Sequence, residues 1–436
     1  MRNTTTKITA LLMASVIMMS GCQGRNNSRR STREEKPSDP EMFNTTIDYE
    51  DLDRVSFNEQ DFNSDYNSYS FRLMSQVLSG EDSDANVMVS PASIMFAMDL
   101  AAAGANGDTL TQITDLYAEG SDPQEQQAFA AAMMNRINAS EDVVFNTANA
   151  IWTNDNRMSS GLNPDYQDYV EEYFDAQANQ EAFSMDTVNE INSWIEENTN
   201  GMIDHVLDDL EPEAIAVLVN AIAFEGNWAE AYEDYQVQTM SFTTASGEDI
   251  DVDMLCDETS VYYESDKATG FIKYYEGGQY AFLTMLPSDE SISANEFLSG
   301  FTAEDYNDFI NSRTYEYQVY TRLPEFDYDY DTNLNRVLMS LGVTEAFDED
   351  NADFTGIGFA DDGGNIFIGR VLHNTHIELD RNGTRAAAAT TIVMLDGTAC
   401  LPDEEMIRYV YCDRPFAYAI VDTETMNPIF LGTYNG

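Results

Sequence analysis

The side chains best suited to chemistry are few in this chain of 436 residues, which has three histidines. His205 falls at the end of an expected helix, whereas His373 and His376 share one expected strand. A catalytic histidine acts on a nucleophile or a metal, yet the chain has no Gly-x-Ser-x-Gly elbow, no His-Glu-x-x-His motif and no glycine-rich phosphate loop after an expected strand. We therefore expect no catalytic residues, and a hydrolase is disfavoured.

Carboxylates are too abundant in this chain to mark a site by themselves. Asp327, Asp329 and Asp331 stand at alternate positions, as in a calcium-binding loop. That loop also needs a glycine at its sixth position and a glutamate at its twelfth, and this sequence has neither. We expect a solvated acidic turn there, and we expect no metal site and no cofactor.

The charge balance limits the partners, because the chain has 21 basic and 78 acidic residues. Seven of the basic side chains lie in the first 36 residues, which leaves a balance of −62 for the remaining 400. Such a field repels nucleic acid and polyanions such as heparin. A general adaptation of the surface is the favoured cause, and a specific cationic partner is the alternative.

The N-terminus indicates export. Arg2 and Lys7 flank the start of an apolar stretch, residues 8–19, which is too short to span a bilayer. It ends in Met-Ser-Gly-Cys, which is typical of a bacterial lipoprotein signal with Cys22 as the lipidated residue. An ordinary secretory signal is the alternative. We expect residues 1–21 to be a signal peptide and the protein to be anchored to the cell envelope or surface by lipid only.

The polar, turn-rich residues 22–62 are expected to form a flexible tether after the lipidated cysteine. Three further cysteines follow, Cys256, Cys400 and Cys412. Outside the cytoplasm a Cys400–Cys412 disulfide can form, and free buried thiols are the alternative.

The expected elements change character along the chain. Ser90 is a helix N-cap with Pro91 at the first helical position. Residues 191–203 are an amphipathic helix stopped by Asn-Gly, and residues 214–223 are apolar except for Asn220, as in a strand buried on both faces. Helical patterns dominate the first half and strand patterns the second, which predicts an α+β fold with large sheets.

One stretch, Asn382 to Leu395, matches neither a helix nor an ordinary strand. Four consecutive alanines favour a helix, but four of the five residues that follow Ala389 are Thr, Ile or Val, which favour a strand. No charge occurs from Ala386 to Leu395, which is unusual for an exposed loop.

Six stretches, in order, resemble the serpin family over residues 64–436, and we expect a serpin domain at 63–436. They are NVMVSPASIMFAMDLAAAGANGDT, INSWIEENTNGMI, LVNAIAFEGNW, LGVTEAFDEDNADFTGI, VLHNTHIELDRNGTRAAAAT, and the closing pair CDRPFAYAI with IFLGTY. The resemblance implies three β-sheets, eight or nine helices and an exposed reactive-centre loop. It also implies suicide inhibition of a protease, in which the cleaved loop inserts into the main sheet as a strand.

The resemblance assigns roles to the unusual stretch. The reactive bond would join Gly397 to Thr398, although the long loop leaves any bond from Met394 to Cys400 open. The side chains that would point into the core after insertion carry no charge, and Arg385 would face solvent. The hinge would comprise Gly383, Thr384, Arg385, Ala386, Ala387, Ala388, Ala389 and Thr390.

The resemblance also implies two sites in the body. A polar "shutter" beneath the opening sheet would comprise Ser90, Ser93, Asn220 and His373, and Trp228 would mark the "breach" where insertion begins.

The chain departs from the family in its charges. Arg381 and Arg385 replace glutamates common in the hinge, and Asn374, Glu225 and Glu325 stand where lysines are usual.

The loop sequence bounds the target protease. No Arg or Lys lies between Ala386 and Met406, which disfavours trypsin-like enzymes. Gly397 and its small neighbours suit elastase-like or subtilisin-like enzymes, whereas Met394 or Leu395 would suit chymotrypsin-like or papain-like ones. The alternative function is a non-inhibitory surface lipoprotein with a serpin fold that binds a ligand or partner. The small hinge residues favour inhibition.

Overall fold

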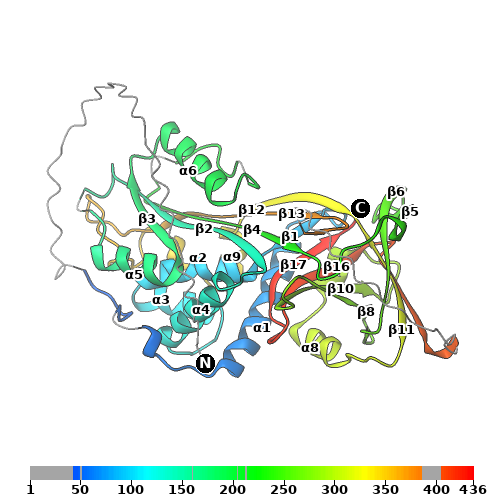
Figure 1. The fold of residues 1–436 in the computed structure, drawn as a ribbon. Helices are drawn as coiled ribbons and strands as arrows, with labels where there is room; N and C mark the ends of the chain where they lie inside the picture. Colours follow the sequence, from blue (N-terminus) through cyan, green and yellow to red (C-terminus); the bar gives the residue numbers. More distant parts are fainter. Residues whose placement is uncertain (1–42, 50–51, 160, 204, 212–213, 385–403) are drawn as a thin grey trace, which may run out of the picture. The chain divides into compact units, whose positions relative to one another are not determined.

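The computed structural model confirms the expected α+β class. It describes residues 43–49, 52–159, 161–203, 205–211, 214–384 and 404–436. Within these residues it contains three β-sheets and nine α-helices (Figure 1).

One of the three sheets has six strands and is called the main sheet below. In it β13 and β4 run parallel and pair directly, and the short β14 lies between them at one end. Its strands, in spatial order, are β12 (Phe326–Asn333), β13 (Ile368–Leu379), β14 (Gly383–Thr384), β4 (Ala216–Asn227), β2 (Val143–Asn154) and β3 (Ala176–Glu181).

Two further sheets complete the β structure. The seven-stranded core sheet contains β1 (Val87–Val89), β17 (Pro428–Tyr434), β16 (Phe416–Asp422), β10 (Tyr280–Pro287), β8 (Ala268–Gly270), β7 (Tyr263–Glu264) and β9 (Ile272–Tyr274). The four-stranded small sheet contains β15 (Ile407–Tyr411), β11 (Gln318–Pro324), β6 (Asp249–Thr259) and β5 (Val237–Thr243).

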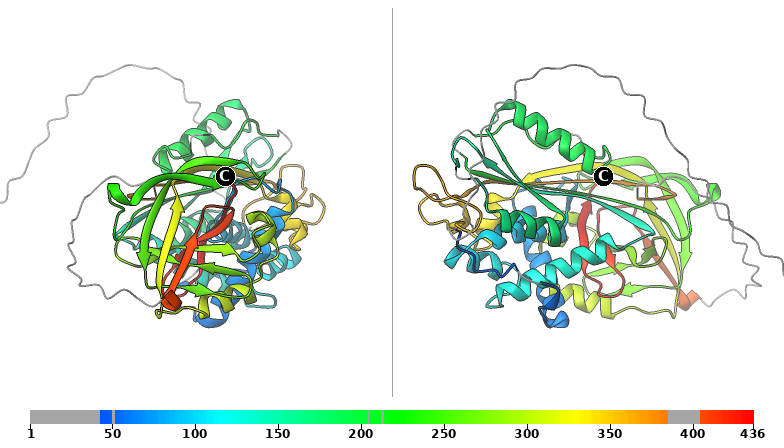
Figure 2. Two further views of the ribbon diagram at one scale, coloured as in Figure 1. Left: turned by 90° about the vertical axis from the view of Figure 1, so that its right-hand side faces the viewer. Right: turned by 60° about the vertical axis from the view of Figure 1, so that its left-hand side comes forward.

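The helices cover the main sheet on both faces. The helices are α1 (Glu59–Leu78), α2 (Pro91–Gly104), α3 (Gly107–Asp115), α4 (Pro123–Asn138), α5 (Pro164–Phe174), α6 (Met185–Asn198), α7 (Ala294–Ser299), α8 (Ala303–Asn311) and α9 (Asn335–Ser340). Every residue of α2 is buried, and this helix contacts β2, β4 and β17. On the opposite face, α6 packs with the outward side chains of β2 and β4 into a second, smaller core (Figures 1 and 2). β4 is therefore covered on both sides, as its apolar sequence predicts.

Local sequence explains where these elements start and stop. The Ser90 side chain accepts a hydrogen bond from the backbone N–H of Ser93, and Pro91 occupies the first helical position of α2, as expected. After α6, Asn200 and Gly201 have φ values of 52° and 72°. This left-handed conformation ends the helix at the predicted Asn-Gly pair.

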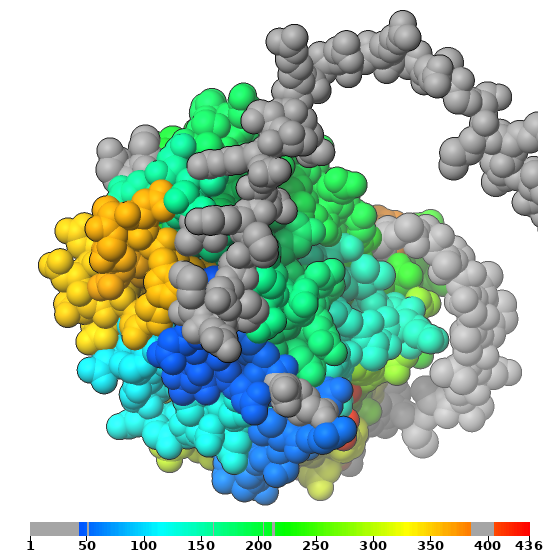
Figure 3. All heavy atoms as spheres, turned by 90° about the vertical axis from the view of Figure 1, so that its left-hand side faces the viewer, coloured from blue at the N-terminus to red at the C-terminus, as the bar shows by residue number. Residues whose placement is uncertain are grey.

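The folded body begins earlier than the expected boundary at residue 63. Phe43 stacks on Phe359, Ile47 and Leu52 are buried, and the Tyr49 hydroxyl donates to the Ala103 carbonyl over 2.6 Å. Figure 3 shows this segment in dark blue against the body. The described part of residues 43–62 is thus packed onto the body, because its apolar side chains find partners there.

The acidic stretch around Asp329 is a strand and not the expected turn. It forms β12 at the edge of the main sheet, where its tyrosines alternate with aspartates. Asp329 is exposed, as predicted, and its Oδ1 lies 2.8 Å from His376 Nδ1. The alternation of aromatic and acidic residues is the period-two pattern of an edge strand with one face in water.

Among the described residues, no helix has the length and apolar character needed to cross a membrane.

Candidate functional site

The four residues predicted to form the shutter come together where β13 meets β4. His373 on β13 is the register partner of Asn220 on β4, and Ser90 and Ser93 come from the first turn of α2. All four are at most 1% exposed. The site therefore joins the two strands of the main sheet to the helix beneath them.

His373 makes two hydrogen bonds that define its state. Its Nε2 accepts from the Ser90 backbone N–H over 3.1 Å, so the ring proton resides on Nδ1, which donates to Asn220 Oδ1 over 2.8 Å. Burial lowers the pKa of His373 to about 3, because water cannot solvate the charged ring there. The ring is thus neutral at physiological pH and bridges the two parallel strands.

The Asn220 amide extends this network to a residue that the sequence did not single out. Its Nδ2 lies 2.6 Å from Asn149 Oδ1 and 2.9 Å from the Ser93 carbonyl oxygen. Asn149 is the register partner of Asn220 on β2 and is 1% exposed. Asn149 closes the partly polar run Asn-Thr-Ala-Asn, so the sequence did not mark it as the apolar run of β4 marked Asn220.

The network also reaches the core sheet. The Ser90 hydroxyl donates to the Ile429 carbonyl over 2.8 Å and accepts from the Ser93 N–H over 3.2 Å. Polar groups in this buried layer are thereby tied to β17, which lies beneath the main sheet.

The first two hinge residues form β14, between the diverging ends of β13 and β4. Gly383 pairs with Asn227 and Thr384 with Gly226, both antiparallel to β4, and Thr384 also pairs with Leu379 of β13. A Cβ atom on Gly383 would lie 2.1 Å from the Gly226 carbonyl oxygen. Only glycine therefore fits this position without displacing the strand.

Thr384 is held in place by an aromatic pair. Its Oγ1 lies 2.7 Å from the Tyr275 hydroxyl, and Tyr275 stacks on Trp228 with ring centroids 4.6 Å apart. The Trp228 indole N–H donates to the Asp380 carbonyl over 2.9 Å, and the Trp228 backbone N–H donates to the Asn382 carbonyl over 2.8 Å. The predicted breach residue thus contacts the start of the hinge. Tyr275 was not predicted, because a tyrosine after a short strand carries no distinctive signal.

Two of the departures from the family, Arg381 and Glu325, face each other. Arg381 Nε lies 3.7 Å from Glu325 Oε1, and the Arg381 backbone N–H donates to the same oxygen over 3.0 Å. The resemblance predicts a glutamate at position 381 and a lysine at position 325, so the two charges stand in the opposite order in this chain.

Several predicted site residues lie outside the described residues. They are Cys22, Arg385, Ala386, Ala387, Ala388, Ala389, Thr390, Gly397, Thr398 and Cys400. Cys412 is described as a free, fully buried thiol whose pKa is raised by burial. Its proposed partner Cys400 lies outside the described residues, so the Cys400–Cys412 pairing stays a prediction.

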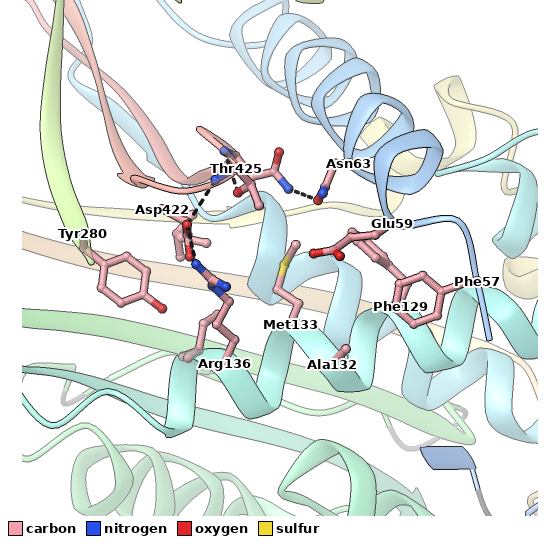
Figure 4. Close-up of a pocket in the computed structure, with 13 residues that line it drawn as sticks. Phe57, Glu59, Asn63, Phe129, Ala132, Met133, Arg136, Tyr280, Asp422 and Thr425 are labelled. Atoms are coloured by element: carbon pink, nitrogen blue, oxygen red, sulfur yellow. Dashed lines mark hydrogen bonds and ion pairs between the residues drawn. The ribbon is translucent and has the colours of Figure 1, made fainter. Parts of the chain in front are cut away.

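A separate pocket of about 70 Å³ lies between α1, α4 and the β16–β17 turn, and none of the predicted site residues lines it (Figure 4). At its edge the Arg136 guanidinium makes two hydrogen bonds to the buried Asp422 carboxylate, and its Nη2 also lies 2.7 Å from Glu424. These partners raise the pKa of Arg136 further. The ion pair ties α4 to the β16–β17 turn, and we assign it a structural role.

Comparisons with known proteins identify the family. The family model described as Serpin (serine protease inhibitor) matches residues 64–436, so the chain belongs to the serpin family. A serpin-like protein of Methanosarcina acetivorans is 29% identical over 86% of this chain and 88% of its own length. Human neuroserpin is 27% identical over 80% of this chain and 85% of its own length.

Solved serpin structures share the fold. The native state of the thermophilic serpin tengpin has a TM-score of 0.80 at 32% identity and covers 88% of this chain and 98% of its own. The latent state of tengpin has a TM-score of 0.73 at 31% identity. Family membership supports a protease-inhibitor type of function in general terms.

Proposed function

We propose that this protein is a suicide inhibitor of endopeptidases that traps the acyl-enzyme by inserting its cleaved loop into the main sheet. One observation carries the proposal. The first two hinge residues already lie between β13 and β4 at one end of this strand pair. A full inserted strand would continue from them along the same line between β13 and β4.

The directions of the strands favour insertion energetically. β13 and β4 run parallel to each other, whereas β14 runs antiparallel to both. Extending β14 would replace one parallel pair by two antiparallel pairs, and antiparallel pairing is slightly more stable per residue. Insertion therefore adds antiparallel backbone hydrogen bonds, and it also buries apolar surface of the loop.

The length and chemistry of the loop suit this strand. β4 and β13 each have 12 residues, and so does the segment from Thr384 to Leu395. Thr384 is buried, so the alternation of a strand would also place the uncharged side chains of Ala386, Ala388, Thr390, Ile392 and Met394 inward. The four alanines need little room where the sheet first opens.

The buried hydrogen-bond network holds β13 and β4 together and must rearrange before the main sheet can open. The His373–Asn220 hydrogen bond spans the strand pair that must separate, so we propose that Ser90, Ser93, Asn220 and His373 exchange partners as the new strand passes. An unpaired buried polar group costs about 1–3 kcal/mol, which makes this exchange a barrier. Trp228 would guide the first residues, because it contacts the chain that leads into the hinge.

The chemical step belongs to the protease. Its nucleophile attacks the carbonyl carbon of the reactive bond, proposed to be Gly397–Thr398, and the amide nitrogen leaves after taking a proton from the protease's general acid. The new amino terminus is released from the peptide bond, but its chain stays folded in the body through β15, β16 and β17, while the residue before the cut remains joined to the protease as an acyl-enzyme. The native chain is kinetically trapped, and insertion before deacylation carries the protease away and distorts its site. The inhibitor contributes no catalytic residue.

Target class and location follow from the loop and the leader. We propose elastase-like, subtilisin-like or chymotrypsin-like targets, with papain-like enzymes as a further class, and no dependence on heparin because of the acidic body. A lipid on Cys22 would hold the inhibitor at the cell envelope, outside the cytoplasm.

The test is to incubate residues 23–436 with an elastase, a subtilisin, a chymotrypsin and a papain-like protease. We expect a covalent complex that survives denaturing electrophoresis with at least one of them, and mass spectrometry would locate the cut. Loop cleavage by all four without any complex would contradict the proposal and favour a non-inhibitory surface protein. Peptide hydrolysis that co-purifies with the chain would instead support the alternative that the protein is a hydrolase.

A further inference from the structure

The outer face of the small sheet carries aromatic side chains outside the core, of which Tyr409 is exposed while Tyr320 and Tyr411 are half-buried. Burial alternates along β11, so that Val319 and Thr321 are buried while Tyr320 and Arg322 point outward. On β15 the core position is Val410, and Tyr409 on the outer face is 58% exposed. We call Tyr320, Arg322, Tyr409 and Tyr411 the tyrosine face.

Strand pairing arranges these side chains in advance. Tyr320 is the register partner of Tyr409, and Arg322 is the partner of Tyr411. The Tyr320 and Tyr409 rings are stacked with centroids 5.7 Å apart, Tyr409 and Tyr411 are 5.4 Å apart, and the Arg322 guanidinium lies 3.8 Å from the centroid of Tyr411. The rings therefore form a continuous surface with little side-chain entropy left to lose on binding.

The arginine of this face differs from many others in the chain. Arg136 and Arg370 bind carboxylates at 2.5 to 3.0 Å, as expected in so acidic a protein. Arg322 instead lies over a tyrosine ring, and its ion pair with Asp413 is longer, at 3.6 Å. Tyrosine and arginine are the residues that most often dominate the binding energy of protein interfaces.

The covalent chain limits how far the reactive bond can lie from this face. β15 starts at Ile407, seven residues after Cys400 and thirteen after Met394, the two ends of the range that holds the reactive bond. An extended chain of that length spans at most about 25–45 Å. A protease that holds the loop in its cleft is therefore kept within reach of the face.

Resting on the proposed function, we propose that the tyrosine face is a second contact for the body of the target endopeptidase, outside its substrate cleft. The continuity of β15 with the loop favours this partner. A second copy of the chain is disfavoured, because two bodies with a charge balance of −62 each repel one another. The contact would be made mainly by rings, so it would select among proteases that accept the same loop sequence.

The test uses the full chain with both outer tyrosines removed, Tyr320→Ala with Tyr409→Ala. Tyr235→Ala is the matched control, because Tyr235 is 77% exposed and lies at the other edge of the same sheet, next to β5. With the protease that gives the covalent complex, we expect the double variant to lower the second-order rate constant of inhibition by about tenfold or more, and the control to leave it unchanged. The stoichiometry of inhibition should not change, because insertion does not involve this face.

Equal rate constants for the double variant and the unmodified chain would overturn the proposal while leaving the inhibitor function intact. If no protease forms a complex, the proposed function fails, and the face is then tested alone with subtilisin whose catalytic serine is replaced by alanine. Binding that the double variant loses would support the face, and binding that it keeps, or no binding at all, would overturn it. Self-association of the unmodified chain that the double variant loses would assign the face to a second copy and also overturn the proposal.

Discussion

The hydroxyl groups of Tyr275 and Thr384 lie 2.7 Å apart, and both side chains are fully buried. This contact joins the hinge to the stack of Tyr275 on Trp228. The start of the reactive loop is therefore held by a specific hydrogen bond and not by backbone pairing alone. Gly383 and Thr384 therefore have a defined position in the native state, here called the hinge seat. The free energy that the hydrogen bond contributes to it can be measured.

The Tyr275–Thr384 contact predicts coupling between two conservative substitutions. Tyr275→Phe and Thr384→Val each remove one hydroxyl, and each should lower the free energy of unfolding by about 1 kcal/mol. Because both remove the same bond, the double variant should lose less than the sum of the two effects. Urea unfolding of the four proteins measures this coupling, and additive losses would show that the hydrogen bond contributes nothing.

The close approach at Gly383 predicts that Gly383→Ala displaces β14. The new methyl group would lie 2.1 Å from the Gly226 carbonyl oxygen, so the two hinge residues must leave their seat. We expect faster proteolysis of the peptide bonds around residue 383 than in the unmodified chain. Gly80→Ala is the control, because its nearest neighbour, the Val77 carbonyl oxygen, would lie at an ordinary 3.5 Å. Identical cleavage rates for the Gly383 variant and the unmodified chain would contradict the close packing of Gly383 against Gly226.

The buried histidine predicts a pH dependence of stability. The pKa of His373 is about 3 in the folded state and about 6.5 in the unfolded state, so the unfolded state binds an extra proton between these values. Stability from this residue is present above about pH 6.5 and is lost as the pH falls, by about 1.4 kcal/mol per pH unit. The advantage of the unmodified chain over His373→Gln should shrink at that slope between about pH 6 and pH 4. A constant difference would show that the ring is charged in the folded state.

Asp99 predicts the opposite pH dependence. It is fully buried in α2, and burial raises its pKa well above the ordinary value. Its Oδ1 accepts from Gln127 Nε2 over 2.9 Å, while Oδ2 has no hydrogen-bond partner among the described residues. The folded state keeps the proton that the unfolded state loses above about pH 4, so this residue destabilises the fold as the pH rises.

Asp99→Asn keeps the acceptor for Gln127 and removes the titration. We expect this variant to be more stable than the unmodified chain by about 2 kcal/mol or more at pH 7, with the gain declining as the pH is lowered toward 4. Urea unfolding at several pH values measures it. A variant that is less stable at pH 7 would show that the carboxyl has a charged partner in the fold.

Much of the fold could be predicted from the sequence because its strongest signals are local. The Ser90–Pro91 start of α2 and the apolar run of β4 are both found as predicted. The resemblance to serpins, and not the strand pattern, assigned Asn220 and His373 to one polar site, and the structure places the two side chains 2.8 Å apart. The helix start and the buried strand were predictable because capping and apolar burial are decided by neighbouring residues.

The remaining features depend on contacts that the sequence does not display. Phe43 and Ile47 stand in a polar segment, and their burial depends on surfaces far along the chain. The aspartates around Asp329 read as a turn because their charge masked the alternation of an edge strand. Asn149 and Tyr275 acquire their roles only from the strands and rings that lie opposite them.

The most direct measurement is the thermal unfolding temperature before and after a single cut in the reactive loop. The account predicts a large increase, because the freed strand completes the main sheet from the seat at Gly383 and Thr384. It also predicts that Ala388→Asp abolishes most of this increase, since the alternation places that side chain in the core. An unfolding temperature that is unchanged or lower after cleavage would contradict insertion and the inhibitory mechanism with it.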